Sequence, residues 1–227
     1  MKTSHIPRRG ILGVAVVMLL VLAACDGGAE APEADQPPAA TASGTEASAE
    51  EVATGFLEAF GAFEADRAIG YLAEDAAIAQ LNGSVGSNAG GTLDELRLLI
   101  DFLEAAGYRQ ELGACEETGT STSGTEVRCP FEFHLFGSDQ LGLGPYAAGS
   151  TFDLTVEDGL IVTASQDFGT VEFSPEMWEP FADWVSTTHP EDVAIMYTDA
   201  SQSGVRLSEE SIRLWRRNVI GYVEDHT

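Results

Sequence analysis

The chain has 227 residues and is strongly acidic: 37 Asp and Glu stand against 11 Lys and Arg, which gives a formal net charge of −26. Lys2, Arg8 and Arg9 lie near the start, and no lysine follows them. Nucleic-acid binding and docking on anionic lipid heads both need clustered Lys and Arg, so this charge argues against both. With 44% hydrophobic and 8% aromatic residues, the chain has enough apolar side chains for a packed core.

The first 25 residues have the layout of an export signal. Positive residues precede the apolar run 11–22, which is too short to span a bilayer. The sequence Leu-Ala-Ala-Cys at 22–25 resembles the lipobox of bacterial lipoproteins. The resemblance implies that residues 1–24 are a signal peptide and that Cys25 carries a diacylglyceryl group. We therefore expect an exported protein, lipid-anchored to the outer face of the bacterial cell membrane; an uncleaved anchor or ordinary cleavage nearby are the alternatives.

Residues 25–49 predict a disordered acidic tether behind the lipidated cysteine. After Cys25 the segment is rich in Ala, Pro, Gly, Ser, Thr and Glu, with no aromatic residue and no aliphatic residue larger than Ala. Such a segment cannot bury enough apolar surface to offset its ordering entropy. We expect a flexible spacer that ends where the folded domain, residues 50–227, begins.

The segment 50–107 predicts helices with one short strand between them. Val52, Phe56 and Phe60 recur at helical spacing, and Gly107 is a typical helix terminator. The predicted elements, in chain order, are a helix over 50–63, a helix over 67–73 capped by Asp66, a strand over 75–81, a loop over 82–91 and a helix over 93–106 capped by Thr92.

Strands dominate the segment 108–168. Segments 108–117 and 126–136 flank a Gly/Ser/Thr-rich turn, and alternation continues through 152–156, the tight turn Glu157-Asp158-Gly159 and the strand 160–168. Antiparallel pairing of the first two segments sets Cys115 opposite Cys129 and Glu116 opposite Arg128. With Cys25 acylated, Cys115 and Cys129 remain as an even pair, and outside the cytoplasm we expect a disulfide.

The order of these elements resembles the nuclear transport factor 2-like superfamily, which includes SnoaL-like polyketide cyclases and ketosteroid isomerases. The resemblance spans roughly residues 50–170 and depends on Phe56 to Phe60, on Asp66, Leu72 and Asp75, and on the hairpin 157–168. It implies an α+β fold in which a curved antiparallel sheet wraps N-terminal helices into a cone with a pocket.

The stretch from about Phe173 onward exceeds the usual length of that superfamily. We expect extra C-terminal helices there, with Trp178, Phe181 and Trp184 closing the cone. A helix is predicted to start at His189–Asp192, and Ser208 is expected to cap the last helix, in which Ile212 to Tyr222 share an apolar face.

Four residues are candidates for the pocket: Tyr71, Gln166, Trp178 and Trp184. Gln166 alternates with apolar residues and should point inward, either as the pocket floor or as a hydrogen-bonded core amide. Tyr71 and both tryptophans are read either as ligand contacts or as ordinary packing residues.

The sequence identifies no catalytic residue. Asp66 is read as a helix cap, Asp75 as the end of a helix or start of a strand, and His134 as solvent-facing or hydrogen-bonded at the sheet surface. No metal site and no cofactor motif is recognised. The cluster Arg206, Arg213, Arg216 and Arg217 either pairs with acids of its own domain or marks a site for an anionic partner.

These observations favour a membrane-anchored, non-catalytic domain whose cone binds a small apolar ligand or an envelope protein. A SnoaL-like isomerase, cyclase or dehydratase requires an Asp, Glu or His projecting into the cavity. A structural or interaction protein requires a cone filled by side chains. Nothing in the sequence fixes the oligomeric state.

Overall fold

The structure is a computed structural model that describes residues 47–87 and 89–227. The predicted signal peptide, the predicted lipidation site Cys25 and all but the last three residues of the predicted tether lie outside the described residues. In the part of the chain that the structure describes, every helix is too short or too polar to cross a lipid bilayer.

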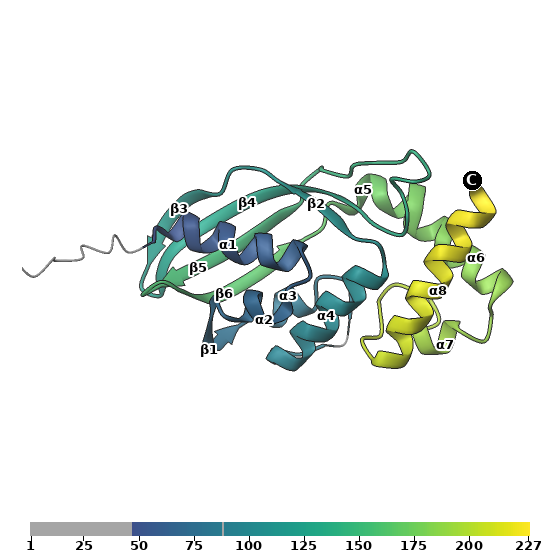
Figure 1. The fold of residues 1–227 in the computed structure, drawn as a ribbon, viewed down its shortest axis with the longest axis horizontal. Helices are drawn as coiled ribbons and strands as arrows, with labels where there is room; N and C mark the ends of the chain where they lie inside the picture. Colours follow the sequence, from purple (N-terminus) through teal and green to yellow (C-terminus); the bar gives the residue numbers. More distant parts are fainter. Residues whose placement is uncertain (1–46, 88) are drawn as a thin grey trace, which may run out of the picture. The chain divides into compact units, whose positions relative to one another are not determined.

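A six-stranded sheet forms the centre of the fold, in the order β1-β6-β5-β4-β2 with β3 also on β4 (Figure 1). β1 pairs with β6 in parallel, and the other pairs are antiparallel. β2 and β3 pair with successive halves of β4, so they form one interrupted edge. The strands are β1 (Leu72–Ala77), β2 (Arg109–Leu112), β3 (Glu116–Ser121), β4 (Gly124–His134), β5 (Thr151–Glu157) and β6 (Leu160–Asp167).

Four helices precede or interrupt the first strands, and α1 packs along β3 to β6 (Figure 1). Ser48 and Thr92 begin α1 and α4 with capping boxes. In each, the hydroxyl accepts a hydrogen bond from the backbone amide of the glutamate three residues later, and that glutamate's carboxylate accepts one from the backbone amide of the capping residue. The Thr92 cap is therefore confirmed. The helices are α1 (Ala49–Gly61), α2 (Ala65–Ile69), α3 (Ala79–Asn82) and α4 (Leu93–Ala105).

The predicted alternation along the sheet is confirmed. In β4, Val127, Cys129, Phe131 and Phe133 are buried, while the residues between them are exposed. The predicted disulfide Cys115–Cys129 is present with a Cα–Cα distance of 4.2 Å, and Glu116 lies opposite Arg128 as expected. The expected α+β class, with helices first and then a curved sheet, is thus found.

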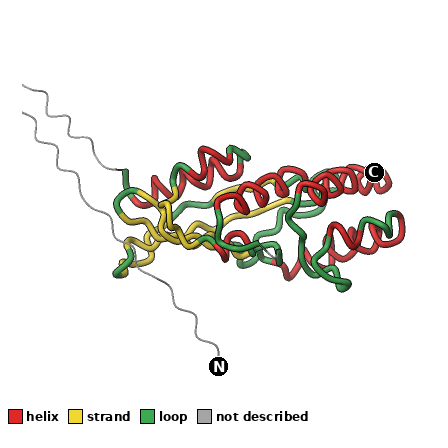
Figure 2. The backbone as a smooth tube through the Cα atoms, turned by 90° about the horizontal axis from the view of Figure 1, so that it is seen from below, coloured by secondary structure: helices red, strands yellow, loops and turns green. Residues whose placement is uncertain are grey.

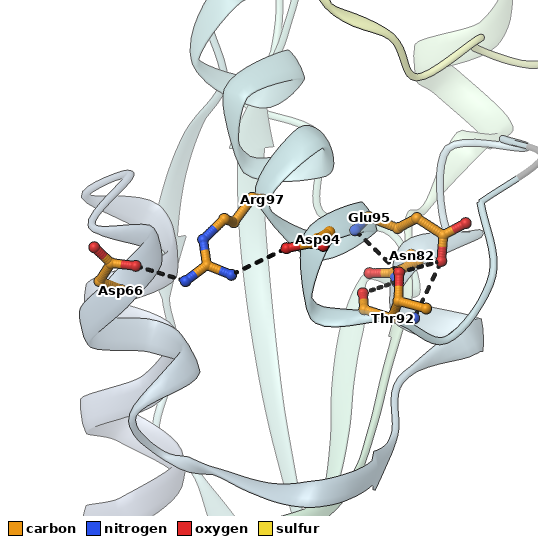
Figure 3. Close-up of polar contacts among 6 residues, drawn as sticks. All are labelled: Asp66, Asn82, Thr92, Asp94, Glu95 and Arg97. Carbon is orange, nitrogen blue, oxygen red and sulfur yellow. Dashed lines mark hydrogen bonds and ion pairs between the residues drawn. The ribbon is translucent and has the colours of Figure 1, made fainter.

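The prediction for residues 66–81 is wrong in detail. α2 begins at Ala65 with Glu64 before it, and no side chain caps it. Asp66 is instead an exposed helix residue that accepts from Arg97 Nη2 at 2.7 Å (Figure 3). The strand starts at Leu72, three residues earlier than predicted, and α3 follows it. Pairing of Leu72 with Ile161 of β6 fixes this register, and local propensity does not reveal such a distant partner.

We call residues 49–167 the cone and residues 170–226 the extension. Figure 2 shows the strands gathered in one part of the fold and the helices of the extension in another. The extension begins at Thr170, slightly earlier than expected, and its first three elements form a continuous helical run. It contains α5 (Thr170–Phe173), the π-helix η1 (Ser174–Trp178), α6 (Glu179–Thr188), α7 (Val193–Met196) and α8 (Glu209–His226).

Two predictions for the extension have different outcomes. Ser208 does cap the last helix, since its hydroxyl accepts from the amide of Ser211 at 3.2 Å. The helix predicted to start at His189–Asp192 begins only at Val193, after a turn. α8 packs on α4 of the cone, which joins the two parts through a helix–helix interface.

Candidate functional site

A cleft of about 410 Å³ lies where the ends of β4 and β6 meet the extension. Its apolar lining is dominated by four aromatic side chains, which we call the aromatic wall: Phe102, Phe168, Phe173 and Trp178. Its exposed polar lining, the rim, consists of Thr170, Glu179, Ser201 and Ser203. Val85, Leu135 and the less exposed Ser84 and Ser174 complete the side chains around it.

The loop that brings Ser84 and Val85 to the cleft is held at its base by Asn82. This buried side chain donates to the carbonyl oxygens of Gly90 at 2.6 Å and Thr92 at 3.1 Å. The hydroxyl of Thr92 bonds Glu95, and this hydrogen bond lowers the pKa of the Glu95 carboxyl (Figure 3). The loop between α3 and α4 is therefore closed at both ends by side chains that belong to helix termini.

The loop 199–204 of the extension forms the opposite side of the cleft. Hydrogen bonds from Ser201 and Ser203 to the Asp199 carboxylate tighten it and lower the pKa of Asp199 to about 2. Trp178 Nε1 donates to the carbonyl of Gln202 at 3.0 Å, and Gln202 Nε2 donates to Ser186 Oγ at 2.8 Å. These bonds fasten the loop to η1 and α6 beside the aromatic wall.

A backbone crossing joins the two loops. Gly204 lies so close to the carbonyl oxygen of Gly86 that a Cβ at Gly204 would clash with it. Gly86 has a φ of +67°, and the amide of Val205 donates to the carbonyl of Val85 at 3.4 Å. Glycine is needed at both positions, because any side chain would separate the loops and open the cleft.

The interior of the cone is occupied by side chains. The Phe131 ring lies 4.6 Å from Phe152, and the Phe133 ring lies 4.9 Å from Phe168. Phe60 of α1 meets Phe152 edge-on at 5.7 Å. The cleft is therefore at the end of the cone, and Phe168 belongs both to the packed interior and to the aromatic wall.

A chain of polar side chains runs through this apolar interior. Ser84 Oγ donates to Gln166 Oε1 at 3.1 Å, and Gln166 Nε2 lies 3.5 Å from the Tyr108 hydroxyl. Tyr108 donates to Gln110 Oε1 at 2.9 Å, and Gln110 Nε2 donates to the carbonyl of Leu57 at 2.7 Å. Burial raises the pKa of Tyr108, because an ionised phenolate would lose its hydration. Gln166 is thus a hydrogen-bonded core amide.

The four predicted pocket residues do not converge. Trp178 lines the cleft, and Gln166 reaches it only through Ser84. Trp184 instead donates to Asp225 Oδ2 at 3.0 Å and packs on Tyr222, with ring centroids 5.6 Å apart. Tyr71 lies against α1 at Gly55. Phe102 and Phe173 were not among the predicted pocket residues, although the helical spacing of Phe102 within 93–106 was a usable signal.

The acids and histidine considered as bases lie away from the cleft. Asp66 pairs with Arg97, Asp75 is exposed on β1, and His134 Nδ1 bonds Ser138 Oγ at 3.1 Å. The one titratable side chain of the lining is Glu179, which is exposed and accepts from Ser174 Oγ at 3.3 Å. Within residues 47–87 and 89–227, no group of three or more His, Cys, Asp and Glu is arranged to hold a metal ion.

Three arginines of the predicted basic cluster bind within the domain. Arg216 pairs with Glu104 of α4 at 2.9 Å, and Arg217 pairs with the buried Asp192. Arg206 donates to the carbonyl oxygens of Tyr197 and Thr198 at 3.3 and 3.4 Å. The contacts of Arg216 and Arg217 favour the first interpretation of the cluster, in which its side chains pair with acids of their own domain, whereas Arg206 bonds the backbone.

No protein-family model matches the sequence, and no curated protein matches it. Solved structures similar to this chain include an NTF2-like protein of unknown function from Cytophaga hutchinsonii, with 14% identity over 56% of this chain and 95% of that one, at a TM-score of 0.38.

Two further structures carry the description "putative polyketide cyclase". The one from Pseudomonas putida has 13% identity over 57% of this chain and 98% of that one, at a TM-score of 0.38. The one from Xanthomonas campestris has 17% identity over 54% and 90%, at a TM-score of 0.36. These three structures are similar to this chain in fold alone.

Proposed function

We propose that this protein is an exported, lipid-anchored bacterial lipoprotein whose domain binds a small, largely apolar ligand without transforming it. The observation that carries the proposal is the aromatic wall, in which the partly exposed rings of Phe168 and Trp178, backed by the buried rings of Phe102 and Phe173, line a cleft of about 410 Å³. Ligand sites are typically clefts of a few hundred Å³ with apolar walls and a small number of polar groups. Because the cone is filled and the aromatic cleft lies at its end, the structure supports ligand binding at the cleft better than a reaction inside the cone.

The polar groups around the cleft support binding without catalysis. General acid–base chemistry requires a titratable group within hydrogen-bond reach of the reacting atoms and with a pKa near the working pH. Glu179, the titratable side chain among the described lining residues, is exposed, and its carboxylate already accepts a hydrogen bond from Ser174 Oγ.

Comparison of two Val→Trp variants of the full chain tests ligand binding. Each protein is purified from membranes in copolymer-stabilised lipid discs and extracted with organic solvent, and the extracts are compared by mass spectrometry. Val85 lines the cleft, so Val85→Trp should fill it and remove a compound that the wild type retains. Val171 is 80% exposed and does not line the cleft, so Val171→Trp should retain the compound.

Ser203→Trp, a change at the exposed rim, is extracted in the same way, so that ligand binding is still tested if the Val85 variant misfolds. Circular dichroism would confirm that each variant is folded. Identical extracts from wild type, Val85→Trp and Ser203→Trp would refute ligand binding at this cleft.

Lipid anchoring is tested separately by growing cells with an alkyne-labelled palmitate. The wild type should become labelled and remain with the membrane fraction, whereas Cys25→Ser should carry no label. Equal labelling of both proteins would contradict the assignment of Cys25 as the acylated residue.

A further inference from the structure

We infer that the ligand of this cleft is an apolar molecule that ends in a protonated amine. The inference rests on the proposed function and adds the chemical class of the ligand. It depends on the direction of the hydrogen bonds around the rim, on the sign of the local charge and on the position of Trp178.

The serine hydroxyls around the cleft have already given their hydrogens to other acceptors. Ser201 and Ser203 bond the Asp199 carboxylate, and Ser174 bonds the Glu179 carboxylate. An ionised carboxylate can only accept, so each of these serines is the donor. Asp199, with a pKa of about 2, is ionised across the neutral range.

Ser84 follows the same pattern from the inner side of the cleft. Its hydroxyl donates to the amide oxygen of Gln166, whose amide nitrogen faces Tyr108. The serine oxygens facing the cleft therefore retain lone pairs and have no hydrogen to offer. A ligand that only accepts hydrogen bonds finds no partner in these four serines and is left with the hydroxyl of Thr170, whereas a ligand that donates finds several acceptors.

Acidic side chains predominate around the cleft. The helical run from Thr170 to Thr188 carries Glu172, Glu176, Glu179 and Asp183 and no Lys or Arg. Asp199 begins the opposite loop, next to the Thr198 carbonyl that accepts from Arg206, and none of the described lining residues is basic. An anionic ligand would meet like charges here, while a cation would be attracted.

The neighbouring residues Trp178 and Glu179 both line the cleft. An indole face attracts a cation, and a carboxylate strengthens a hydrogen bond from an ammonium group. The aromatic wall would hold the apolar body of the ligand, and the rim would hold its charged end. This division matches an amine better than a neutral alcohol, which supplies a single uncharged donor.

Three probes that share one apolar body test the inference: naphthylmethylamine, naphthylmethanol and naphthoate, each added to the full chain in lipid discs at pH 7. Binding is measured by isothermal titration calorimetry, with Val85→Trp as the reference for uptake outside the cleft. We expect the amine to bind roughly tenfold more tightly than the alcohol. The naphthoate should show no binding above the reference.

Two charge-removing variants on the same helical run locate the effect. Glu179→Gln should lower the affinity for the amine to near that of the alcohol, because it removes the rim carboxylate. Glu176→Gln removes an equal charge at an exposed position outside the lining and should leave the tenfold preference. Both positions are exposed, so neither change should affect folding.

The outcomes separate the inference from the proposed function. If the alcohol or the naphthoate binds the wild type as tightly as the amine, and Val85→Trp abolishes that binding, the cleft binds ligands but the amine assignment is wrong. An amine preference that survives in Glu179→Gln also overturns the assignment. If none of the probes binds the wild type above the Val85→Trp reference, both the assignment and ligand binding at the cleft are contradicted.

Discussion

The cone and the extension satisfy their buried polar groups differently. In the cone, the buried side chains of Tyr108, Gln110 and Gln166 form one continuous hydrogen-bonded chain. Among the described residues, buried polar atoms without a hydrogen-bond partner occur in both regions, and more of them lie in the extension: Asn82 Oδ1 and Tyr146 Oη in the cone, and Tyr197 Oη, Ser211 Oγ, Trp215 Nε1 and Asn218 Oδ1 in the extension. A buried polar group without a partner costs free energy, so both regions lose some stability in this way, and the extension loses more.

This difference teaches that the two regions contribute to the cleft in different ways. The filled cone supplies one side of the cleft, and the extension supplies the other. η1 is consistent with that division, because single turns of π-helix are often found at functional sites. Trp178, the aromatic residue of the extension that the loop 199–204 fixes, belongs to this π-helix.

The largest expected effect comes from removing the side chain that joins the two regions. Trp215 is fully buried and lies 5.3 Å from Phe102 and 5.2 Å from Phe136, both outside the extension. Trp215→Ala should lower the free energy of unfolding by about 3–5 kcal/mol. Denaturant unfolding followed by circular dichroism measures this loss in the free energy of unfolding. A loss below about 1 kcal/mol, close to the effect of a surface substitution, would show that the regions are weakly coupled.

The second prediction concerns the cone alone. Replacing Cys115 and Cys129 by Ala removes a bond that spans 14 residues and should cost about 3 kcal/mol. Reduction of the wild type serves as the matched control and should give the same shift in the denaturant midpoint. A double variant as stable as the oxidised wild type would contradict this account of the disulfide.

A pair of Tyr→Phe variants sharpens the comparison directly. Tyr108→Phe removes a hydroxyl that bonds Gln110 and should cost about 1 kcal/mol. Tyr197→Phe removes a hydroxyl without a protein partner and should be neutral or slightly stabilising. Thermal unfolding of both variants gives the two values. Equal losses would mean that the buried polar groups of cone and extension are equally well satisfied.

The smallest effect is a pH dependence at the rim. The pKa of Asp199, lowered to about 2 by Ser201 and Ser203, lies below its ordinary value, so the stabilisation is complete above about pH 4 and is lost as the pH falls through 2. The melting temperature of the wild type should therefore approach that of Asp199→Asn as the pH falls from 4 to 2. A difference between them that stays constant over this range would show that the carboxylate titrates normally.

Sequence patterns predicted the elements whose causes are local or periodic. Thr92 and Ser208 were recognisable caps, and the alternation of Val127, Cys129 and Phe131 predicted both the inward face and the disulfide register. The start of β1 at Leu72 was missed, because its register is fixed by Ile161 in the parallel strand β6. No pattern within the segment 66–81 contains that information.

The candidate site was less accessible to prediction than the fold. Trp178 was identified from the run of aromatic residues in the extension, but the cleft also requires Phe102 from α4 and Phe173 from α5. These residues come together only because α8 packs on α4 and the two loops cross at Gly86 and Gly204. Such long-range packing has no local signature, and the hydrogen-bonded state of Gln166 likewise depends on Ser84.

The crossing of Gly86 and Gly204 has a consequence for shortened chains. The last strand of the sheet ends at Asp167, but the cleft also needs Gly204 against Gly86. A chain that stops before Gly204 therefore contains every residue of the sheet yet lacks one side of the cleft.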